Sequence, residues 1–493
     1  MAKGHLVFIG GGEDSNLIFN KIFELVGGIN NVRLAIVPAA SGHVAKTISS
    51  YEEYFENDLH LKKENIWSIP LAITDDESTP DIDESQWKDN AYNQEFCEKI
   101  KNYNIIFLVG GDQRKYIKVL KRDFSNSPLL NEIIAIYENG GVVAGTSAGS
   151  NIQGETIIAG GRSEEALDNK VSFNEADDDG EKLVILKGIG LISNTIIDTH
   201  FDVRGRIGRL IDATVITKNR FGFGIGEKTA IIYYPDSTIE IIGFGDVMVT
   251  DIETAKILSN PNENLHINNV KVHLFSHGDK FNLISNLFSP HNEKMNIKYT
   301  PAYDRSDYNI SLDVFNKYEA NKIIVKYMLD NEASDAIGIM GSEKITYHGD
   351  KSSFLRFVEA DETSAFFSKL ILENEEELSK YSGANVYVDV VPFIYENADK
   401  RSNSHEALVY SIENELQVIV FDKKDSLPVC DAKIELYKNN ELIYRTGTNK
   451  FGKAVITKFL LQSEKYRIVI KDEQESHESD FIFEENMHGI CMV

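Results

Sequence analysis

The first half of the chain alternates short apolar runs with segments of helical periodicity. The apolar runs end in glycine or other small residues, as in HLVFIGGG (5–12), NIIFLVGGD (104–112) and GGVVAGTS (140–147). Between them, segments such as SNLIFNKIFELVGG (15–28) place apolar residues at the spacing of one helix face. Continuous apolar strands that alternate with helices are typical of a mostly parallel sheet with flanking helices. We therefore predict an α/β fold for residues 5 to about 250.

The pattern changes after this region, and it predicts three units. Hairpin-like strands surround PDS (235–237), and the core of the first unit is expected to close within residues 1–284. Residues 285–412 mix polar, helix-like and strand-like segments and are predicted to form a mixed α/β extension without an assigned chemistry. Residues 413–493 show short alternating strands separated by turn residues, which predict a small β-sandwich. Within this last unit, LPVCDAKIELYKNNELIYRTGTNKFGKAVI (427–456) resembles prealbumin-like or carboxypeptidase-regulatory modules.

Composition narrows the classes of function. The chain has 493 residues, a formal net charge of -26 and 42% hydrophobic residues, so it can bury a large core but offers no basic surface for nucleic acid or an anionic membrane. The N-terminus shows no leader pattern, and no apolar run approaches the length of a membrane span. Three well-separated cysteines favour a reducing compartment, so we expect a cytoplasmic protein. No cluster has metal-ligand spacing, and no cofactor is expected.

The segment GTSAGS (145–150) makes Ser147 a candidate nucleophile. A serine held on a tight strand-to-helix turn needs small neighbours, because the strained backbone leaves no room for larger side chains. The G-x-S-x-G pattern alone arises by chance in roughly one or two of every ten chains of this length. Its position after a predicted strand strengthens the interpretation, because ligands gather at the carboxyl ends of such strands.

His200 is the candidate base for this serine. It ends the predicted strand NTIIDTH (194–200), which we expect to lie in the same sheet as the strand before Ser147. A neutral imidazole can take the proton of a serine hydroxyl, and a third group must then orient the imidazole. Spacing alone leaves four acids open for that role: Glu155, Glu164, Glu165 and Asp168.

Further candidates lie on a neighbouring strand end and on the helix after His200. In VGGDQRK (109–115), backbone N–H groups near Gly111 and Asp112 would stabilise an oxyanion together with the N–H of Ala148, unless GGD is only a turn. Helical spacing puts Arg206 and Arg209 on one face and Arg204 on another. One face suits a substrate carboxylate and the other a structural ion pair, and three solvated arginines are the competing interpretation.

Three motifs together resemble the cyanophycinase family of serine peptidases, which has a class I glutamine amidotransferase-like fold and is related to the aspartyl dipeptidases. They are GGDQ at 110–113, GTSAG at 145–149 and D-x-H-F-x-x-R-x-R-x-x-R-L at 198–210. The resemblance covers residues 5 to 283 and implies that Ser147 is the nucleophile, His200 its base and Glu165 the acidic member of the triad. The residues that fall on substrate-binding positions are Gln113, Asp198, Thr199, Arg204, Arg206 and Arg209.

The resemblance also implies a substrate, and this chain differs from the family in two features. The family hydrolyses cyanophycin, multi-L-arginyl-poly-L-aspartate, to β-Asp-Arg dipeptides through an acyl-enzyme. On this reading arginines would bind a substrate carboxylate, and an acid such as Asp198 would bind its guanidinium. Family members more often carry glutamine where this chain has Thr199, and residues 285–493 have no counterpart in the minimal enzyme.

Other functions stay open at this stage. One is an aspartyl or isoaspartyl dipeptidase that acts on short peptides, and another is a catalytically inactive binding or scaffold relative. An ordinary α/β-hydrolase esterase gives the arginine run no role. The acidic stretch NEADDDGE (174–181) is either a solvated loop or an attractor for arginine-rich polymer. The partners expected are therefore cyanophycin or a β-aspartyl peptide, with no nucleic acid and no membrane, and a homodimer is left open.

Overall fold

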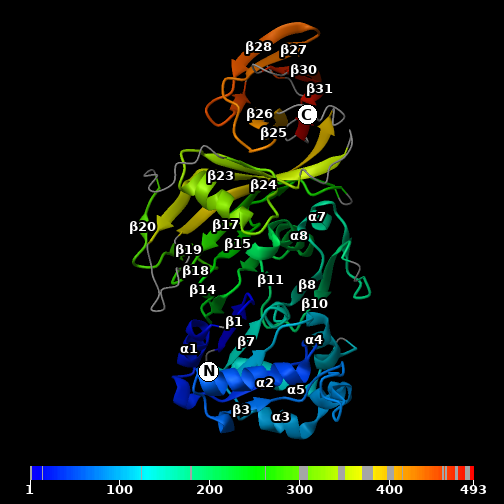
Figure 1. Cartoon of the computed structure of the whole chain (residues 1–493), viewed down its shortest axis with the longest axis vertical. Coiled ribbons are helices and arrows are strands. Elements are labelled where there is room, and N and C mark those ends of the chain that lie inside the picture. The colour runs from blue at the N-terminus through cyan, green and yellow to red at the C-terminus, as the bar shows by residue number, and fades with distance from the viewer. Residues whose placement is uncertain are drawn as a thin grey trace.

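The computed structural model shows an elongated stack with the N-terminal α/β unit at one end and the C-terminal β-rich unit at the other (Figure 1). Between them lie the long paired strands β23 (Lys351–Phe367) and β24 (Tyr381–Glu396). The structure describes residues 3–13, 15–123, 125–177, 180–260, 263–298, 309–341, 350–368, 381–396, 405–412, 415–457, 460, 463–471, 476–483 and 489–492.

A nine-stranded sheet forms the N-terminal unit, in the order β19-β18-β14-β13-β1-β7-β4-β2-β3. Its parallel strands are β1 (His5–Ile9), β7 (Val142–Thr146), β4 (Ile105–Leu108), β2 (Leu34–Val37) and β3 (Ile66–Ser68). Its antiparallel strands are β13 (Thr229–Tyr233), β14 (Thr238–Gly243), β18 (Lys280–Asn282) and β19 (Leu287–Ser289). The prediction of an α/β unit is confirmed, and the hairpin at PDS is β13–β14.

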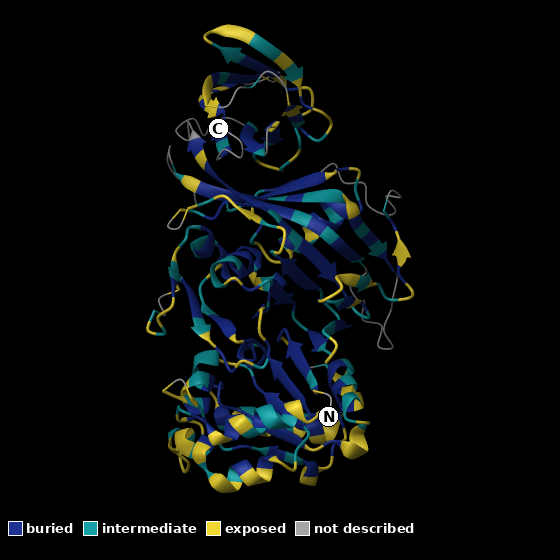
Figure 2. Ribbon diagram, turned by 180° about the vertical axis from the view of Figure 1, so that it is seen from behind, coloured by how far each residue is buried: buried dark blue, intermediate teal, exposed yellow. Residues whose placement is uncertain are grey.

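Side chains alternate between the two faces of the sheet along each strand, and apolar side chains lie on both faces. Helices therefore cover both faces. Leu6 and Phe8 of β1 join one core cluster with Leu130 of α5 (Pro128–Glu138), whereas Val7 and Ile9 join another with Ile22 of α1 (Asn16–Leu25). The unit also contains α2 (Val44–Glu53), α3 (Gln94–Ile100), α4 (Gln113–Leu120) and the short α6 (Ala148–Asn151). Figure 2 shows these strands as a continuous buried layer beneath helices with exposed outer faces.

The chain between β4 and β7 forms two helices, α4 and α5. Asp112 caps α4 by accepting a hydrogen bond from the N–H of Arg114. The short antiparallel pair β5 (Lys121–Arg122) and β6 (Ser125–Asn126) then interrupts the chain. Ser127 caps α5 through the N–H of Leu130, and a proline follows at the first helical position, where it is pre-organised for a helix.

A second large sheet contains strands from all three predicted units. Its path runs β11-β12-β15-β17-β24-β32-β25-β26-β29, with β23 beside β24. The bounds of the strands not yet given are β11 (Thr195–Thr199), β12 (Phe221–Ile225), β15 (Val247–Asp251), β17 (Ile267–Phe275), β32 (Gly489–Met492), β25 (His405–Ile412), β26 (Glu415–Asp422) and β29 (Lys453–Ile456). Strands on the two sides of each predicted boundary, at 284 and at 412, are hydrogen-bonded to one another. The division into three units therefore stays a prediction.

A separate four-stranded sheet lies in the C-terminal region, which is β-rich as predicted. Its order is β28 (Glu441–Gly447), β27 (Lys433–Lys438), β30 (Glu464–Lys471) and β31 (Ser476–Phe483). Val409 and Val418 from the long sheet share a buried core with Ile434 and Ile468 from this sheet. The packed pair of sheets therefore starts at β25, a few residues before the predicted boundary at 413.

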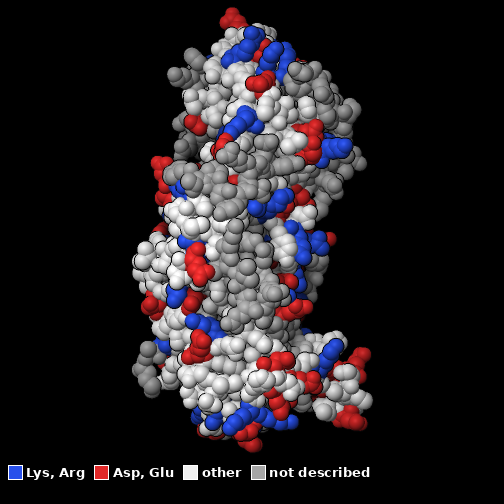
Figure 3. Space-filling model, turned by 60° about the vertical axis from the view of Figure 1, so that its left-hand side comes forward, with Lys and Arg blue, Asp and Glu red and all other residues white. Residues whose placement is uncertain are grey.

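The surface carries charges of both signs. On the face shown in Figure 3, Lys and Arg side chains are interspersed with Asp and Glu among the described residues. No helix of the described part of the chain is both long enough and apolar enough to cross a membrane.

The extension and the N-terminal unit share one hydrophobic core. Phe201 and Leu210, close to His200 in sequence, pack in the same cluster as Ile324 of the helical segment η6 (Ile323–Leu329) and Val388 of β24. The helix-like part of the extension is α9 (Glu319–Lys322) followed by η6. Removing the extension would expose this apolar surface to water, which is unfavourable at about 25 cal/mol per Å².

We expect a fragment of residues 1–284 to fail to fold by itself. It would expose the core face beside α8 (Ile207–Thr217) and leave β17 without its partner β24. The fragment and the full chain would be expressed side by side, and solubility and thermal unfolding by circular dichroism compared. A soluble fragment with a cooperative unfolding transition would show that the extension is dispensable for stability.

Candidate active site

Ser147 lies on a strained turn between β7 and the short helix α6 (Ala148–Asn151). Its backbone has φ 51° and ψ -116°, a conformation that is costly for a residue with a side chain. The N–H of Ser147 donates to the carbonyl of Ile9 at 2.9 Å, which fixes the turn to the end of β1. A Cβ on Gly145 would lie 2.1 Å from the carbonyl oxygen of Gly149, so this pair of small residues is required for the turn. The structure thus gives GTSAG the physical role predicted for it.

His200 meets Ser147 from the other sheet. Its Nε2 lies 2.9 Å from Ser147 Oγ, and its own N–H donates to the carbonyl of Gly10 at 2.8 Å. His200 follows β11, which belongs to the second sheet, so the prediction of a common sheet was wrong. Both residues are nevertheless held by the end of β1, where a Cβ on Gly11 would lie 2.4 Å from the imidazole.

Glu227 is the acid that contacts His200. Its Oε1 lies 2.7 Å from His200 Nδ1, and it sits in the turn between β12 and β13. The prediction that Glu165 orients the imidazole is corrected by this geometry. Glu165 lies on α7 (Ser163–Leu167), which packs against α8. The sequence did contain a signal in GIGEKTA (224–230), where a glutamate follows glycines at a strand end.

Burial lowers the pKa of His200 below its ordinary value of 6.5. The hydrogen bond to Glu227 raises it, and the nearby charges of Arg204 and Arg206 lower it further. The imidazole is therefore mainly neutral at pH 7, which is the form that can accept a proton from a hydroxyl. A serine, a neutral histidine and a carboxylate joined by two hydrogen bonds form an arrangement that can generate a nucleophilic oxygen.

Asp198 forms a buried ion cluster with two of the three arginines. It is 0% exposed and accepts hydrogen bonds from Arg209 Nε at 2.7 Å and from Arg206 Nη1 at 3.2 Å. Burial alone would raise the pKa of Asp198, but the charges of Arg209 and Arg206 outweigh that effect and the pKa is lowered. The carboxylate is thus occupied by the protein's own guanidinium groups, and the prediction that it binds a substrate guanidinium is wrong.

The other predicted pocket residues differ in how far they are available. Arg204 is exposed on the short turn η5 (Asp202–Arg204) directly after the histidine, apart from the ion cluster. Thr199 is only 1% exposed, and its carbonyl accepts a hydrogen bond from Arg206. Gln113 is half-buried and donates through Nε2 to the carbonyl of Ile158 at 2.8 Å. Of these, Arg204 presents a free face to solvent.

Two of the three predicted oxyanion donors remain open. The N–H of Asp112 is already used, because it donates to the carbonyl of Ala40 at 3.0 Å. No hydrogen bond among the described residues uses the N–H of Gly111 or Ala148. The loop is close to the serine, since a Cβ on Gly110 would lie 3.3 Å from Ser147 Cβ. The expected pair is therefore reduced to Gly111 and Ala148.

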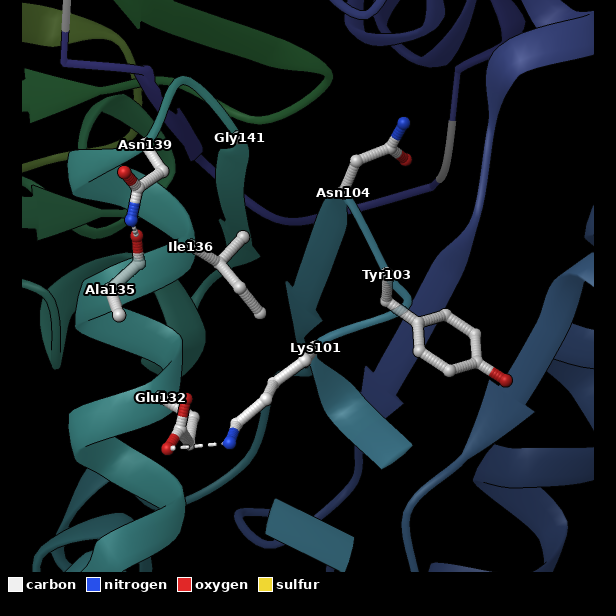
Figure 4. Close-up of a pocket in the computed structure, with 8 residues that line it drawn as sticks. All are labelled: Lys101, Tyr103, Asn104, Glu132, Ala135, Ile136, Asn139 and Gly141. Atoms are coloured by element: carbon white, nitrogen blue, oxygen red, sulfur yellow. Dashed lines mark hydrogen bonds and ion pairs between the residues drawn. The ribbon is translucent and has the colours of Figure 1, made fainter. Parts of the chain in front are cut away.

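A separate pocket lies at the opposite end of the same strands. It has a volume of about 350 Å³ and is lined by Lys101, Tyr103, Asn104, Glu132, Ala135, Ile136, Asn139 and Gly141 (Figure 4). Gly141 precedes β7 whereas Ser147 follows it, so this pocket opens at the amino ends of the parallel strands. In the described residues, no three His, Cys, Asp or Glu side chains gather closely enough to hold a metal ion.

Comparisons with known proteins agree with the motifs. The model of peptidase family S51 matches residues 6–242. A cyanophycinase of Nostoc sp. (strain PCC 7120 / SAG 25.82 / UTEX 2576) is 31% identical over 297 residues, which cover 58% of this chain and 88% of the relative. A cyanophycinase of Geminocystis herdmanii (strain PCC 6308) is 30% identical over 288 residues, which cover 57% and 94%.

Among solved structures, a peptidase from an acI-B1 Actinobacterium covers 50% of this chain and 91% of its own, at 20% identity and a TM-score of 0.36.

We expect Glu227→Gln to slow modification of Ser147 by a fluorophosphonate probe by about 10²- to 10⁴-fold, because an amide neither holds the imidazole in the required tautomer nor stabilises its cation. The matched variant Glu165→Gln is expected to react within about threefold of the wild type. Labelling would be followed by intact-protein mass spectrometry, with Ser147→Ala as the blank. The reverse pattern, with Glu165→Gln slow and Glu227→Gln unaffected, would restore the first assignment.

Proposed function

Because the chain belongs to peptidase family S51, the family of the cyanophycinases, and is a serine-type peptidase, we propose that it hydrolyses cyanophycin to β-Asp-Arg dipeptides. The observation that carries this proposal is the chain of hydrogen bonds from Ser147 through His200 to Glu227. The two relatives named above, which match this chain over 88% and 94% of their own length, are cyanophycinases, and this supports the choice of substrate.

The proposed reaction follows from the geometry of the three side chains. His200 Nε2 takes the proton of Ser147 Oγ as that oxygen attacks the carbonyl carbon of a main-chain Asp–Asp peptide bond, while Glu227 holds the Nδ1–H. The β-linked arginine stays attached to its aspartate and leaves with it as the dipeptide. The backbone N–H groups of Gly111 and Ala148 would stabilise the oxyanion. The imidazolium then protonates the leaving amine, and water attacks the acyl-enzyme with His200 again as base.

Substrate recognition is assigned first to Arg204. It is the exposed arginine beside His200, and a guanidinium is suited to a substrate carboxylate because it can donate two parallel hydrogen bonds. Arg206 and Arg209 instead hold Asp198 and fix the backbone that carries the histidine. Thr199 is buried, so its side chain belongs to this frame and not to the surface that meets the substrate.

An aspartyl or isoaspartyl dipeptidase is the second candidate. One observation favours it: two of the three arginines that pointed to an arginine-rich polymer are committed to Asp198. A catalytically inactive scaffold is less well supported, since the serine, histidine and carboxylate are all present and connected.

The finer class of fold and the location are also proposals. The nucleophile turn after a parallel strand supports a class I glutamine amidotransferase-like arrangement. The three free cysteines, Cys97, Cys430 and Cys491, support a reducing compartment such as the cytoplasm. The net charge of -26 argues against nucleic acid as a partner.

Purified protein incubated with insoluble cyanophycin should release β-Asp-Arg, and Ser147→Ala should release none. Soluble products would be identified by mass spectrometry, with β-Asp-Arg and other isoaspartyl dipeptides tested as substrates in parallel. Turnover of the dipeptides without release from the polymer would select the dipeptidase instead. Inactivity on both, with Ser147 still reactive toward a fluorophosphonate, would refute both proposed substrates.

The rate is expected to fall with decreasing pH only below pH 6.5. The base works in its neutral form, and burial lowers the pKa at which His200 becomes protonated, so the activity present at pH 7 is lost as the pH falls through that lowered value. The pH dependence of kcat/KM, or of Ser147 labelling, measures this midpoint. In Glu227→Gln the residual rate should show a still lower midpoint, because Glu227 raises the pKa of His200. A wild-type midpoint above pH 7 would contradict the assignment.

A further inference from the structure

Two acidic residues, Asp202 and Asp246, contact the turn that carries Glu227. Asp202 is 8% exposed, and a Cβ on Gly226 would lie 2.8 Å from its Oδ2. The N–H of Gly226 donates to the main-chain carbonyl of Asp246 at 3.0 Å. Burial and the charge of Asp246 raise the pKa of Asp202 to about 7, while the backbone N–H of Glu227 is among the hydrogen bonds that lower it. The carboxyl group of Asp202 thus touches the backbone that positions the acid of the active site.

Two residues of the extension donate hydrogen bonds to these acids. Asn321 of α9 donates through Nδ2 to Asp246 Oδ2 at 2.9 Å. The N–H of Tyr318 donates to the main-chain carbonyl of Asp202 at 2.8 Å. These two contacts come from one short stretch of chain, and each holds one of the two acids that contact the turn.

A third contact holds the segment after His200. A Cβ on Gly205 would lie 1.9 Å from the carbonyl oxygen of Phe315, and a Cβ on Gly208 would lie 2.9 Å from the ring of that residue. The backbone of the extension therefore packs directly against the turn that carries Arg204. The neighbouring residues Ile323 and Ile324 continue into the core shared with Phe201.

We propose that Asp202, Asp246 and Asn321 are positioning residues that hold the Glu227 turn, and that residues 318–321 of the extension therefore belong to the catalytic unit. They act through the backbone of residues 226 and 227. This inference rests on the proposed function only in taking Ser147, His200 and Glu227 as the reacting set. It gives a role to a region that lies outside the match to the family model, which ends at residue 242.

The test compares Asn321→Ala with Asn316→Ala. Asn316 is an exposed asparagine of the extension that lies just before residues 318–321, and its side chain accepts a hydrogen bond from the neighbouring Lys317 N–H. The first readout is the rate at which a fluorophosphonate labels Ser147, which needs no knowledge of the substrate. The second is the low-field proton resonance of His200 Nδ1–H, which reports the hydrogen bond to Glu227 directly.

We expect Asn321→Ala to slow labelling by about 10- to 100-fold, the cost of a small misplacement of a catalytic group, and to weaken the low-field resonance. Asn316→Ala should leave both unchanged. On any substrate that is turned over, kcat should fall while KM stays within about twofold. A second pair guards against misfolding: Asp246→Ala should behave like Asn321→Ala, and Asp246→Asn, which keeps an oxygen acceptor, should recover most of the lost rate.

The proposal is overturned if folded Asn321→Ala and Asp246→Ala both label within twofold of the wild type with an unchanged resonance. It is equally overturned if the rate falls only in proportion to the fraction of unfolded protein measured by circular dichroism. Normal labelling of the wild type without release of β-Asp-Arg would reject the proposed substrate and leave this inference intact.

Discussion

The end of β1 is the constraint on which the active site depends. The carbonyl of Ile9 accepts the N–H of Ser147, that of Gly10 accepts the N–H of His200, and that of Gly11 accepts the N–H of Lys228 beside Glu227. Three successive carbonyls of one strand end thus fix the backbone at or beside all three members of the set. Since Ser147 comes from one sheet and His200 from the other, this strand end also joins the two sheets. A side chain at Gly11 would collide with the imidazole, so this glycine of IGGG is required by the site itself.

Buried charge performs a second structural task beside this one. Asp198 and Arg209 are almost fully removed from water, and Arg206 completes the cluster. Removing one partner from a buried pair costs roughly 3–5 kcal/mol, because the remaining charge is left unpaired. The D-x-H-F-x-x-R-x-R-x-x-R-L pattern is therefore mainly a structural signature. It links the strand before His200 to the helix after it, and it leaves Arg204 exposed.

Local sequence was informative where the chemistry is local. The nucleophile turn needs small residues within five positions, and the helix caps at Asp112 and Ser127 need an oxygen within three, so both could be predicted from adjacent residues. The acid partner of His200 could not be predicted in this way. Glu165 and Glu227 are both glutamates in the vicinity of strand ends, and only the three-dimensional course of β12 brings one of them to Nδ1. The misassigned sheet of His200 has the same origin, because strand neighbours depend on long-range pairing.

The extension shows why division of the chain by sequence pattern has a limit. A change from α/β alternation to a mixture of polar, helix-like and strand-like segments suggested a separate unit after residue 284, yet β17 pairs with β24 and the core runs across that limit. Hydrophobic periodicity describes which face of an element is buried, and it does not say which other element covers that face. Here the covering elements include α9 and η6, which come from the predicted second unit and pack beside the turn that holds Glu227. On the proposal above, Glu227 and Asn321, one of the residues that hold its turn, therefore lie on opposite sides of the boundary that the sequence pattern predicts.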